Sequence, residues 1–436
     1  MRYLFYSSLL FLSYTLIAQN QYFQPGKDWL DTEGKLIEAH ATGILKQGDT
    51  YFWYGENKSK GNTNLVGISC YSSKDLLNWK NEGVVLAAAD MPSDFNAAIT
   101  KDAVCERAKV IYNAKTKKYV MWMHLDSKSY TSASAGIAIA DKPNGNFKFI
   151  SFKRPVKYAY NYNLSRGEAY NTHEKELGNT FRDMNLFVDT DGKAYVFYAS
   201  EDNATMYVVR LNESFTDVEQ PLVEGKNWAR IFINGNREAP APFKYKNKYY
   251  IFTSGLTGWA PNPAQYAVAP SIFGPWEVKG NPCVGIESET TFRSQSTFVL
   301  PAPNAPDGSF IFMADRWDGT TLENSRYMWL PFVVKDEEIV IRNYEKWNLS
   351  ILNNKNEALS KPNASITSSI NGIPKLTWTT IAGADIYQIY KNGKNVGATT
   401  YSEFAISAEL AARAFHYTVV AQNIHCLLYT SPSPRD

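Results

Sequence analysis

The sequence predicts an all-β chain, a five-bladed β-propeller followed by a small β-sandwich module. From about residue 22 to 350, short segments of alternating apolar and polar residues are separated by Gly, Asn, Asp and Pro turns, which is typical of β-strands. Signals for helices are sparse. Five of these segments share one pattern, at a period of roughly 55 to 75 residues, which indicates similar structural units stacked in an array.

Each of the five repeats starts with a polar residue, continues as an apolar strand, turns, and resumes as an aromatic-rich strand. In order they are EAHATGILKQGDTYFWYGE from Glu38, ERAKVIYNAKTKKYVMWMH from Glu106, RDMNLFVDTDGKAYVFYAS from Arg182, REAPAPFKYKNKYYIFTSG from Arg237 and SQSTFVLPAPNAPDGSFIFMAD from Ser294. Serial, similar units of about four strands fit a propeller better than a sandwich. The first strand of each blade lines the axis of a propeller, so its first residues ring one end of the channel.

A polar side chain occupies nearly the same early position in most of the repeats. Counting back about a dozen residues from the aromatic after each turn leads to Ala39 or His40, then Glu106, Asp183 and Glu238, and to Gln295 in the fifth repeat. We expect these groups to converge on one point, as in an active site. The alternative is a set of ordinary strand-end carboxylates, each paired with the arginine beside it, namely Arg107, Arg182 or Arg237.

Clustered carboxylates at the end of a narrow channel repel one another, which raises the pKa of at least one of them. A protonated acid beside an ionised one can cleave a glycosidic bond, because the acid protonates the leaving oxygen while a base activates water. Glu238 is the candidate acid, since the prolines and small residues of REAPAPF leave room for a sugar. Asp183 is expected to raise the pKa of Glu238 and to hold its orientation.

Composition favours a carbohydrate partner and disfavours nucleic acid. The 45 basic and 43 acidic residues give a net charge of +2 without a basic stripe. Aromatic residues make up 14% of the chain, with 28 Tyr and 11 Trp, and such rings form platforms for sugars. The five His and four Cys show no zinc-ligand spacing. Cys70 and Cys105 leave a disulfide open, but buried free thiols are the preferred interpretation.

The two ends of the chain differ from its middle. Residues 1–18 combine Arg2, an apolar run and a final Ala18, which predicts a secretory signal peptide and a secreted or periplasmic protein. A membrane anchor is the alternative, but the run is short and broken by serines, and we expect no membrane span. Residues 424–436 change composition abruptly and are interpreted as a non-native tail.

A linker is expected at 351–362 and a separate module at 363–423. The module combines Trp378, an aromatic strand with Tyr387 and Tyr390, and an Asn392-Gly393 turn. These features resemble a fibronectin type III module, here incomplete.

Further motifs resemble glycoside hydrolase family 43. The five-blade layout, the three acids, YSSKDLLNW after the first repeat and FGPWEV near 273–278 carry this resemblance over about residues 25–348. AHATGI, WYGENK, CERAKVIYN, YVMWMH, RDMNLFVD, REAPA and SQSTFVLP resemble the exo-β-1,3-galactanase branch. The resemblance implies release of galactose from the non-reducing end of β-1,3-galactan, with inversion. The alternatives are an arabinofuranosidase, xylosidase or galactofuranosidase, or an inactive carbohydrate-binding propeller.

The resemblance leaves the identity of the base open. Most of the family has an Asp base at the start of the first inner strand, where this chain has Ala39 and His40, and the galactanase branch also lacks that Asp. The resemblance implies Gln295, orienting water or acting as an imidic base. On physical grounds an amide is a poor base and Glu106 is preferred, although Glu106 can instead bind sugar hydroxyls.

Matching motifs add four candidates for substrate binding, Glu56, Tyr130, Thr257 and Trp259, the last as a stacking platform. Packing or loop structure is the alternative for each. His40 is interpreted as a satisfied core or rim histidine, and Asp315, Arg316 and Trp317 are expected to shape the rim, with no assigned role. Many propellers of the family hold a central ion through a His in the last blade. SQSTF has none, so we expect no metal and no cofactor, in a monomer.

Overall fold

The computed structural model describes residues 19–61, 63, 66–91, 104–158, 176–354, 359–368, 374–406 and 416–425. The expected signal peptide and most of the expected tail lie outside these residues. The predicted all-β class is confirmed, since strands dominate and the named helical elements are short 3-10 turns, η1 (Ala88–Asp90), η3 (Ser288–Thr290), η4 (Leu322–Asn324) and η5 (Leu349–Asn353). No helix within these residues is long and apolar enough to cross a membrane.

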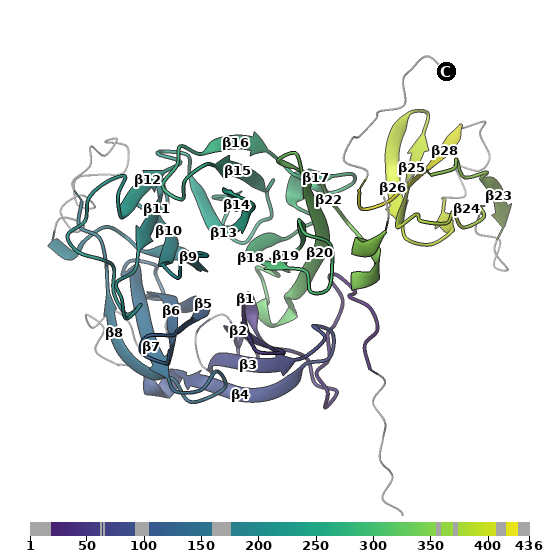
Figure 1. Cartoon of the computed structure of the whole chain (residues 1–436). Helices are drawn as coiled ribbons and strands as arrows, with labels where there is room; N and C mark the ends of the chain where they lie inside the picture. The colour runs from purple at the N-terminus through teal and green to yellow at the C-terminus, as the bar shows by residue number, and fades with distance from the viewer. Residues whose placement is uncertain are drawn as a thin grey trace, which may run out of the picture.

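Five four-stranded antiparallel sheets, counted within the described residues, surround a common centre (Figure 1). The first three consist of β1 (His40–Gln47), β2 (Thr50–Glu56), β3 (Gly67–Ser73), β4 (Lys80–Ala87), β5 (Val104–Asn113), β6 (Lys118–Asp126), β7 (Ser134–Ala140), β8 (Lys148–Lys153), β9 (Arg182–Val188), β10 (Ala194–Ser200), β11 (Thr205–Arg210) and β12 (Trp228–Ile231). The last two consist of β13 (Arg237–Tyr245), β14 (Lys248–Gly255), β15 (Gln265–Ala269), β16 (Glu277–Gly280), β18 (Gln295–Pro301), β19 (Ser309–Arg316), β20 (Arg326–Lys335) and β21 (Glu338–Ile339).

The ring of sheets is closed. The innermost strands β1, β5, β9, β13 and β18 contact one another in turn, and β18 also contacts β1. Aromatic-rich strands hold neighbouring sheets together because successive side chains point to opposite faces. In β2, Tyr51 and Trp53 pack into the cluster shared with the fifth sheet, whereas Phe52 and Tyr54 pack into the cluster shared with the second. Both faces of such a strand are buried, which explains the aromatic half of each repeat.

Each innermost strand contains a β-bulge near its start. In four of the strands one non-glycine residue near the bulge has a positive φ, namely 53° at Ala41, 56° at Arg107, 27° at Asp183 and 55° at Ala239. Such a backbone is uncommon for these residue types, and bulges re-aim side chains. The bulges therefore turn the first residues of the inner strands toward the end of the channel.

The bulges correct the predicted equivalence of Asp183. Its left-handed backbone places it with Arg107 and Ala239, one residue beyond the position of Glu106 and Glu238. The third sheet has Arg182 at that earlier position, opposite Ala199. Counting along the sequence misses this offset, because a bulge adds a residue to one strand and none to its partner.

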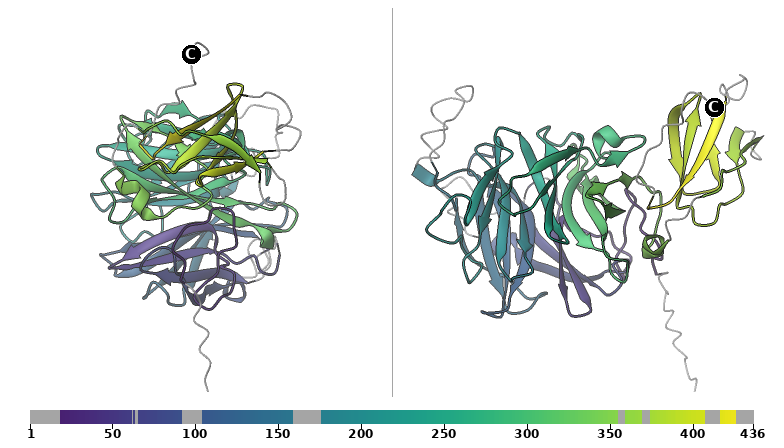
Figure 2. Two further views of the ribbon diagram at one scale, coloured as in Figure 1. Left: turned by 90° about the vertical axis from the view of Figure 1, so that its right-hand side faces the viewer. Right: turned by 45° about the horizontal axis from the view of Figure 1, so that its top comes forward.

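A smaller unit of two three-stranded sheets lies beside the ring (Figure 2). Its strands are β23 (Ser365–Ser368), β24 (Pro374–Thr377), β25 (Ile386–Lys391), β26 (Lys394–Thr399), β27 (Glu403–Ala405) and β28 (Tyr417–Gln422), and β17 (Cys283–Val284) pairs with β22 (Ile341–Arg342) in the ring. Trp378 and Tyr387 pack edge to face in its core, 5.1 Å apart. The buried Arg342 joins the two parts by donating from Nε to Gln422 Oε1 at 3.0 Å. The fibronectin type III identification and the domain boundaries stay predictions.

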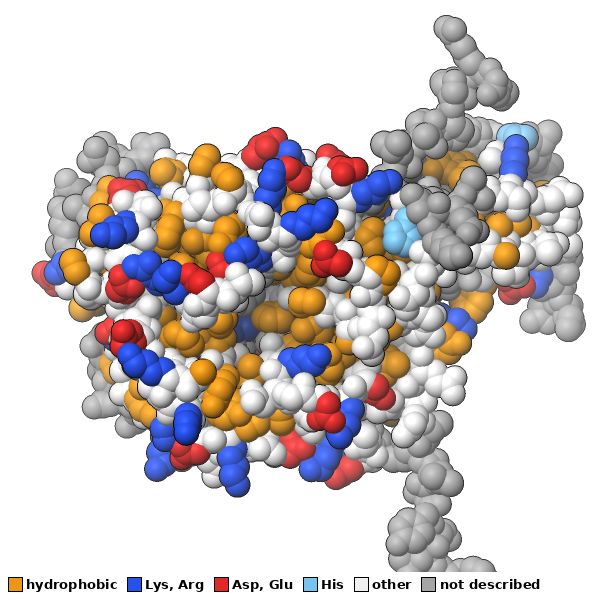
Figure 3. All heavy atoms as spheres, viewed as in Figure 1, with side chains coloured by type: hydrophobic (Ala, Val, Ile, Leu, Met, Phe, Trp, Pro, Cys, Tyr) orange, Lys and Arg blue, Asp and Glu red, His pale blue; other side chains and the backbone are white. Residues whose placement is uncertain are grey.

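The surface charges are mixed, and the described cysteines are free thiols. Acidic and basic side chains are interspersed over the face seen in Figure 3, and hydrophobic side chains surround the hollow at its centre. Cys70, Cys105 and Cys283 are buried free thiols, so the preferred interpretation of the cysteines is confirmed for these three. Cys426 lies outside the described residues.

Candidate active site

A cavity of about 360 Å³ lies at the end of the ring where the inner strands begin, and all five sheets contribute to it. Seven of the eight predicted site residues line it, namely Glu56, Glu106, Tyr130, Asp183, Glu238, Trp259 and Gln295. Thr257 does not, although its neighbours Leu256 and Gly258 do. Its hydroxyl instead donates to Ala260 O and accepts from Asn262 Nδ2, so its contacts stabilise the loop.

Arg107 is the central cation of this cavity. The guanidinium is buried, and its Nε lies 2.8 Å from Asp183 Oδ1. Its other nitrogens donate to Ser296 O at 3.1 Å and to Gln295 Oε1 at 2.5 Å. The alternative in which each arginine pairs with the acid beside it is therefore wrong for Arg107, because the bulge turns its side chain toward the third and fifth sheets.

Gln295 connects Arg107 to the candidate acid. Its Nε2 donates to Glu238 Oε1 at 2.9 Å and to Ser254 Oγ at 3.0 Å. Its Oε1 accepts from Arg107 and, at 3.0 Å, from Trp317 Nε1. Arginine and tryptophan nitrogens only donate, so these two partners fix which end of the amide carries the oxygen.

Glu238 has the electrostatics of a general acid. Burial and the nearby Asp183 raise the pKa of Glu238 to about 8, against the opposing effects of Arg107 and the Gln295 hydrogen bond. Asp183 pairs with Arg107 through one oxygen and accepts the Ala239 N–H at the other, at 3.0 Å. The cavity thus contains a carboxyl group that stays protonated at neutral pH beside one that is paired with a cation.

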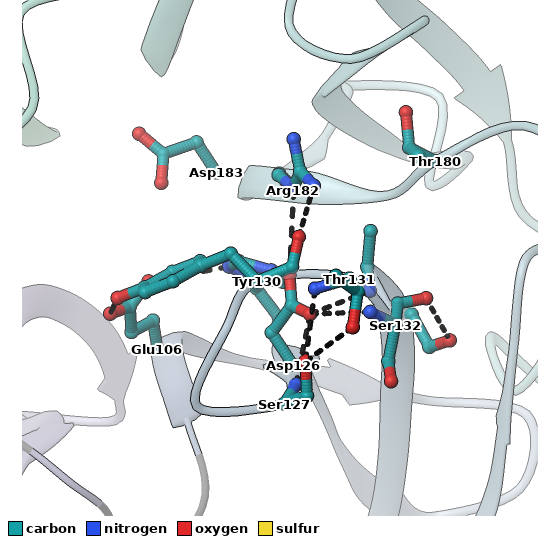
Figure 4. A network of polar contacts seen from close by, with 12 residues as sticks. Glu106, Asp126, Ser127, Tyr130, Thr131, Ser132, Thr180, Arg182 and Asp183 are labelled. Carbon is teal, nitrogen blue, oxygen red and sulfur yellow. Dashed lines mark hydrogen bonds and ion pairs between the residues drawn. The ribbon is translucent and has the colours of Figure 1, made fainter. Parts of the chain in front are cut away.

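Glu106 is held by a histidine and a tyrosine. Tyr130 Oη donates to Glu106 Oε1 at 2.6 Å (Figure 4). His124 Nδ1 lies 3.3 Å from Glu106 Oε2. Burial alone lowers the pKa of His124, but hydrogen bonds to Asp126 and Glu106 outweigh it and raise that pKa to about 9. The pKa of Glu106 falls to about 2, because His124, Lys58 and Tyr130 outweigh its burial. Glu106 is therefore an ionised hydrogen-bond acceptor and a weak base.

Asp126 organises the loop that carries Tyr130. Its Oδ1 accepts the backbone N–H groups of Ser127, Ser132 and Ala133, at 2.9, 2.7 and 2.9 Å. Its Oδ2 binds His124 Nε2 at 3.0 Å. One fully buried carboxylate thus fixes both groups that hold Glu106.

Arg182 supports the same loop from the third sheet. Its Nη2 donates to Tyr130 O at 2.5 Å (Figure 4). Its Nη1 binds Asp202 Oδ1. Tyr130 has a positive φ of 55°, an uncommon conformation that these contacts hold in place.

At or near the end of the second strand of the first and fifth sheets, one carboxylate binds a backbone group of the next sheet. Glu56 Oε1 accepts from Arg107 N at 2.8 Å, and its Oε2 pairs with the buried Lys58 at 2.9 Å. Asp315 Oδ2 accepts from Ala41 N and lies 3.6 Å from His40 Nδ1. His40 is buried between Glu38 and Asp315 and stacks on Tyr327, and it does not line the cavity.

Trp259 and Trp317 form the aromatic part of the cavity wall. Their rings meet edge to face with centroids 5.3 Å apart, and Trp259 is 37% exposed. An exposed indole face beside hydrogen-bonding groups suits the apolar C–H face of a sugar.

Glu106, His124 and Asp183 have ligand atoms within 4.8 Å of one another, a spacing that would suit a metal ion. These atoms already bind Tyr130, Asp126, Arg107 and Ala239 N, so a cation would have to displace several contacts. The expectation of a metal-independent site stays a prediction.

We expect extensive dialysis against EDTA to leave the turnover rate unchanged. Loss of activity restored by a divalent cation would contradict this.

The repeats did not indicate the roles of Arg107, His124, Arg182 and Asn203, which also line the cavity. A signal for His124 was present, because it pairs with Glu106 as Glu56 pairs with His40 and Asp315 with Gln295. The partners of Arg107 and Arg182 come from other sheets, and no spacing within one repeat indicates them.

Comparisons with known proteins agree with this site. The family model of Glycosyl hydrolases family 43 matches residues 38–296. The solved structure of a family 43 β-1,3-galactosidase with galactodeoxynojirimycin has a TM-score of 0.67 and 38% identity, covering 75% of this chain and 100% of that chain. An exo-β-1,3-galactanase from Clostridium thermocellum has a TM-score of 0.65 and 31% identity, covering 84% and 77%.

A second family 43 β-1,3-galactosidase has a TM-score of 0.67 and 29% identity, over 83% of this chain and 73% of that chain. No curated protein matches the chain. The family match spans more than half of the 436 residues and confirms the resemblance drawn from the sequence motifs. The chain belongs to glycoside hydrolase family 43, and it is a glycoside hydrolase.

Proposed function

We propose that this glycoside hydrolase is a five-bladed propeller enzyme acting as an exo-β-1,3-galactanase. It removes galactose from the non-reducing end of β-1,3-galactan, the backbone of plant arabinogalactan, with inversion at the anomeric carbon. The observation that carries the proposal is Glu238, whose pKa is raised to about 8 in a cavity beside Asp183. The similar β-1,3-galactosidase and exo-β-1,3-galactanase structures support the choice of sugar and linkage.

The proton of Glu238 has one free direction. Because Oε1 accepts from Gln295, the proton belongs on Oε2, where Asn203 Nδ2 donates only at the long distance of 3.5 Å. Oε2 can therefore give its proton to the leaving glycosidic oxygen while water adds to the opposite face of the anomeric carbon. Asp183 keeps the acid protonated until substrate arrives.

The arrangement supports a substrate-binding role for Glu106. A carboxylate with a pKa of about 2 is a weak base, but it accepts hydrogen bonds from sugar hydroxyls well. Gln295 is an amide whose four hydrogen-bonding capacities are all used. In an imidic tautomer of Gln295 the oxygen would carry a hydrogen. That O–H would face Arg107 and Trp317, which can only donate hydrogen bonds and cannot accept one. We therefore propose that Gln295 orients Glu238 and the water as an amide.

The raised pKa of Glu238 predicts an alkaline limit of activity. A general acid must be protonated, so kcat/KM is expected to hold below pH about 8 and to fall tenfold per unit above it. Asp183→Asn removes a neighbouring negative charge, lowers the pKa of Glu238 and moves this limb to lower pH. Asp336→Asn is the matched control, since Asp336 is exposed and also has a positive φ, and its limb should not move.

Proton NMR of the anomeric region during hydrolysis of β-1,3-galactotriose tests the function. Galactose released first as the α-anomer supports an inverting exo-galactanase. Early β-galactose contradicts inversion. If no galactose appears, a panel of nitrophenyl arabinofuranosides, xylosides and galactofuranosides separates the alternative glycosidases from a binding-only propeller.

We also propose that residues 1–18 direct the protein to the periplasm or outside the cell, and that residues 363–423 form a fibronectin type III-like module. Arg2, the apolar run and Ala18 support the first proposal. The packing of Trp378 against Tyr387 supports the second.

A further inference from the structure

Main-chain carbonyl groups at the bulges of the inner strands accept hydrogen bonds from side chains. Two buried polar side chains reach these carbonyls, Lys109 in β5 and Asn185 in β9, each 1% exposed. They have comparable places in their sheets, since Lys109 pairs with Trp122 and Asn185 pairs with Phe197 directly after the bulge. Unpaired carbonyls at such a place would otherwise be costly to bury.

Lys109 serves the first two sheets. Its ammonium donates to Ala41 O at 2.8 Å and to Arg107 O at 3.3 Å, and both carbonyls belong to residues with a positive φ. Its stem crosses the channel tightly beside Gly43, where an added Cβ would lie 2.7 Å from Lys109 Cδ. No larger residue than glycine fits at that position of β1 without moving Lys109.

Asn185, in the third sheet, binds carbonyls of the fourth and fifth sheets. Its Nδ2 donates to Pro240 O at 2.8 Å and to Thr297 O at 2.9 Å, both within the bulges of β13 and β18. Together the two side chains link β1 with β5, and β9 with β13 and β18. Each of the five inner strands therefore takes part in one of these two sets of contacts.

The Lys109 contact reaches the active site through Arg107. The backbone of Arg107 is held at its carbonyl by Lys109 and at its N–H by Glu56 Oε1. Its guanidinium then holds Asp183 and Gln295, and Gln295 holds Glu238. A shift of the Arg107 backbone would move each of these groups.

Packing alone does not explain an ammonium group here. Burial and the nearby Arg107 lower the pKa of Lys109 to about 7, although Glu56, Asp315 and Asp183 oppose this. A methionine would fill the same space without burying a charge. Burying the Lys109 ammonium costs free energy, which indicates that the charge is used to bind the carbonyls.

We propose that Lys109 and Asn185 form an axial plug, in which the Lys109 ammonium acts as a built-in cation that binds the bulge carbonyls and positions Arg107 for the reaction. Lys109 is thus a positioning residue, and its role in catalysis rests on the proposed function. The plug does not require that the substrate be galactan.

A second cavity gives access to the plug from the far end of the channel. It measures about 350 Å³ and is lined by Lys109 and by apolar residues of the inner strands, among them Ile44, Val110 and Phe298. Removing the lysine side chain beyond Cβ should join this cavity to the carbonyls. A small alkylammonium ion can then reach them.

The test compares Lys109→Ala, Lys109→Met and wild type at pH 6, below the pKa of Lys109. Both variants are expected to lose about 10- to 100-fold in kcat on β-1,3-galactobiose with little change in KM, as for a misplaced catalytic group. Propylammonium should restore kcat in Lys109→Ala, where space is open, and not in Lys109→Met, where the side chain fills it. Lys335→Ala, at an exposed site, is the control and should behave as wild type.

The outcomes separate the plug from the proposed function. Wild-type kcat in Lys109→Met, or equal loss in both variants with no rescue of Lys109→Ala, overturns the plug. If the wild-type chain itself releases no galactose, the proposed function fails and the plug is judged by melting temperature. Propylammonium should then raise the Tm of Lys109→Ala but not of Lys109→Met, and no difference between them overturns it.

Discussion

Glu238→Gln is expected to lower kcat on β-1,3-galactobiose by about 10³-fold, the upper part of the range for a lost general acid. The leaving group is a sugar alkoxide, which cannot depart without a proton. Glutamine has the shape of the protonated acid and can still accept the hydrogen bond from Gln295 Nε2. Galactose binding, followed by a thermal shift, should therefore be retained, and the loss should appear in kcat.

The leaving group supplies the control for this prediction. A nitrophenolate departs without protonation, so Glu238→Gln should lose far less activity on a nitrophenyl β-galactoside than on the disaccharide. Its pH profile should also lack the alkaline limb near pH 8 that wild type shows. Glu277→Gln, at an exposed site, should match wild type on both substrates. Equal losses on both substrates would assign Glu238 to another role.

The sequence predicted most of the cavity because its residues follow the repeat. Glu106, Glu238 and Gln295 begin equivalent strands, and Glu56 ends one, so a count along the chain brings them together. The predicted position of Asp183 in its repeat was wrong by one residue, because counting along the chain does not detect a bulge. The loop containing Thr257 does border the cavity, as predicted. The Thr257 hydroxyl, however, donates to Ala260 O within the loop and does not line the cavity.

The contacts between sheets were beyond sequence reasoning. Arg107 stands beside Glu106 in the chain, yet it pairs with Asp183 from the next sheet. Lys109 follows two residues later, and its place in the sequence does not distinguish it from an ordinary strand lysine. Only the structure shows that its ammonium donates to Ala41 O. Both pairings depend on how five sheets close into a ring, which no single repeat encodes. Repeats thus predict which residues meet, and closure of the ring decides which of them bind one another.

The environment of Gln295 leads to the second large effect, in Gln295→Glu. A glutamate there keeps the oxygen that accepts from Arg107 and Trp317 but loses the N–H that donates to Glu238. The two carboxyl groups must then share one proton, which is held between them and is no longer available to the leaving group. We expect kcat to fall by about 10²-fold, as for a misdirected general acid.

The direction of the pH shift distinguishes this explanation from simple disruption. An added negative charge beside Glu238 should raise its pKa further, so the alkaline limb of the residual activity should move above that of wild type. Gln295→Met removes the same hydrogen bond without adding charge, and the Gln295 contact lowers the pKa of Glu238 in wild type. The alkaline limb of Gln295→Met should therefore move to higher pH by less than the limb of Gln295→Glu. If Gln295 instead served as an imidic base, glutamate would supply a stronger base at the same place. A Gln295→Glu enzyme with wild-type or higher kcat would refute the amide role and would make position 295 the site of the base.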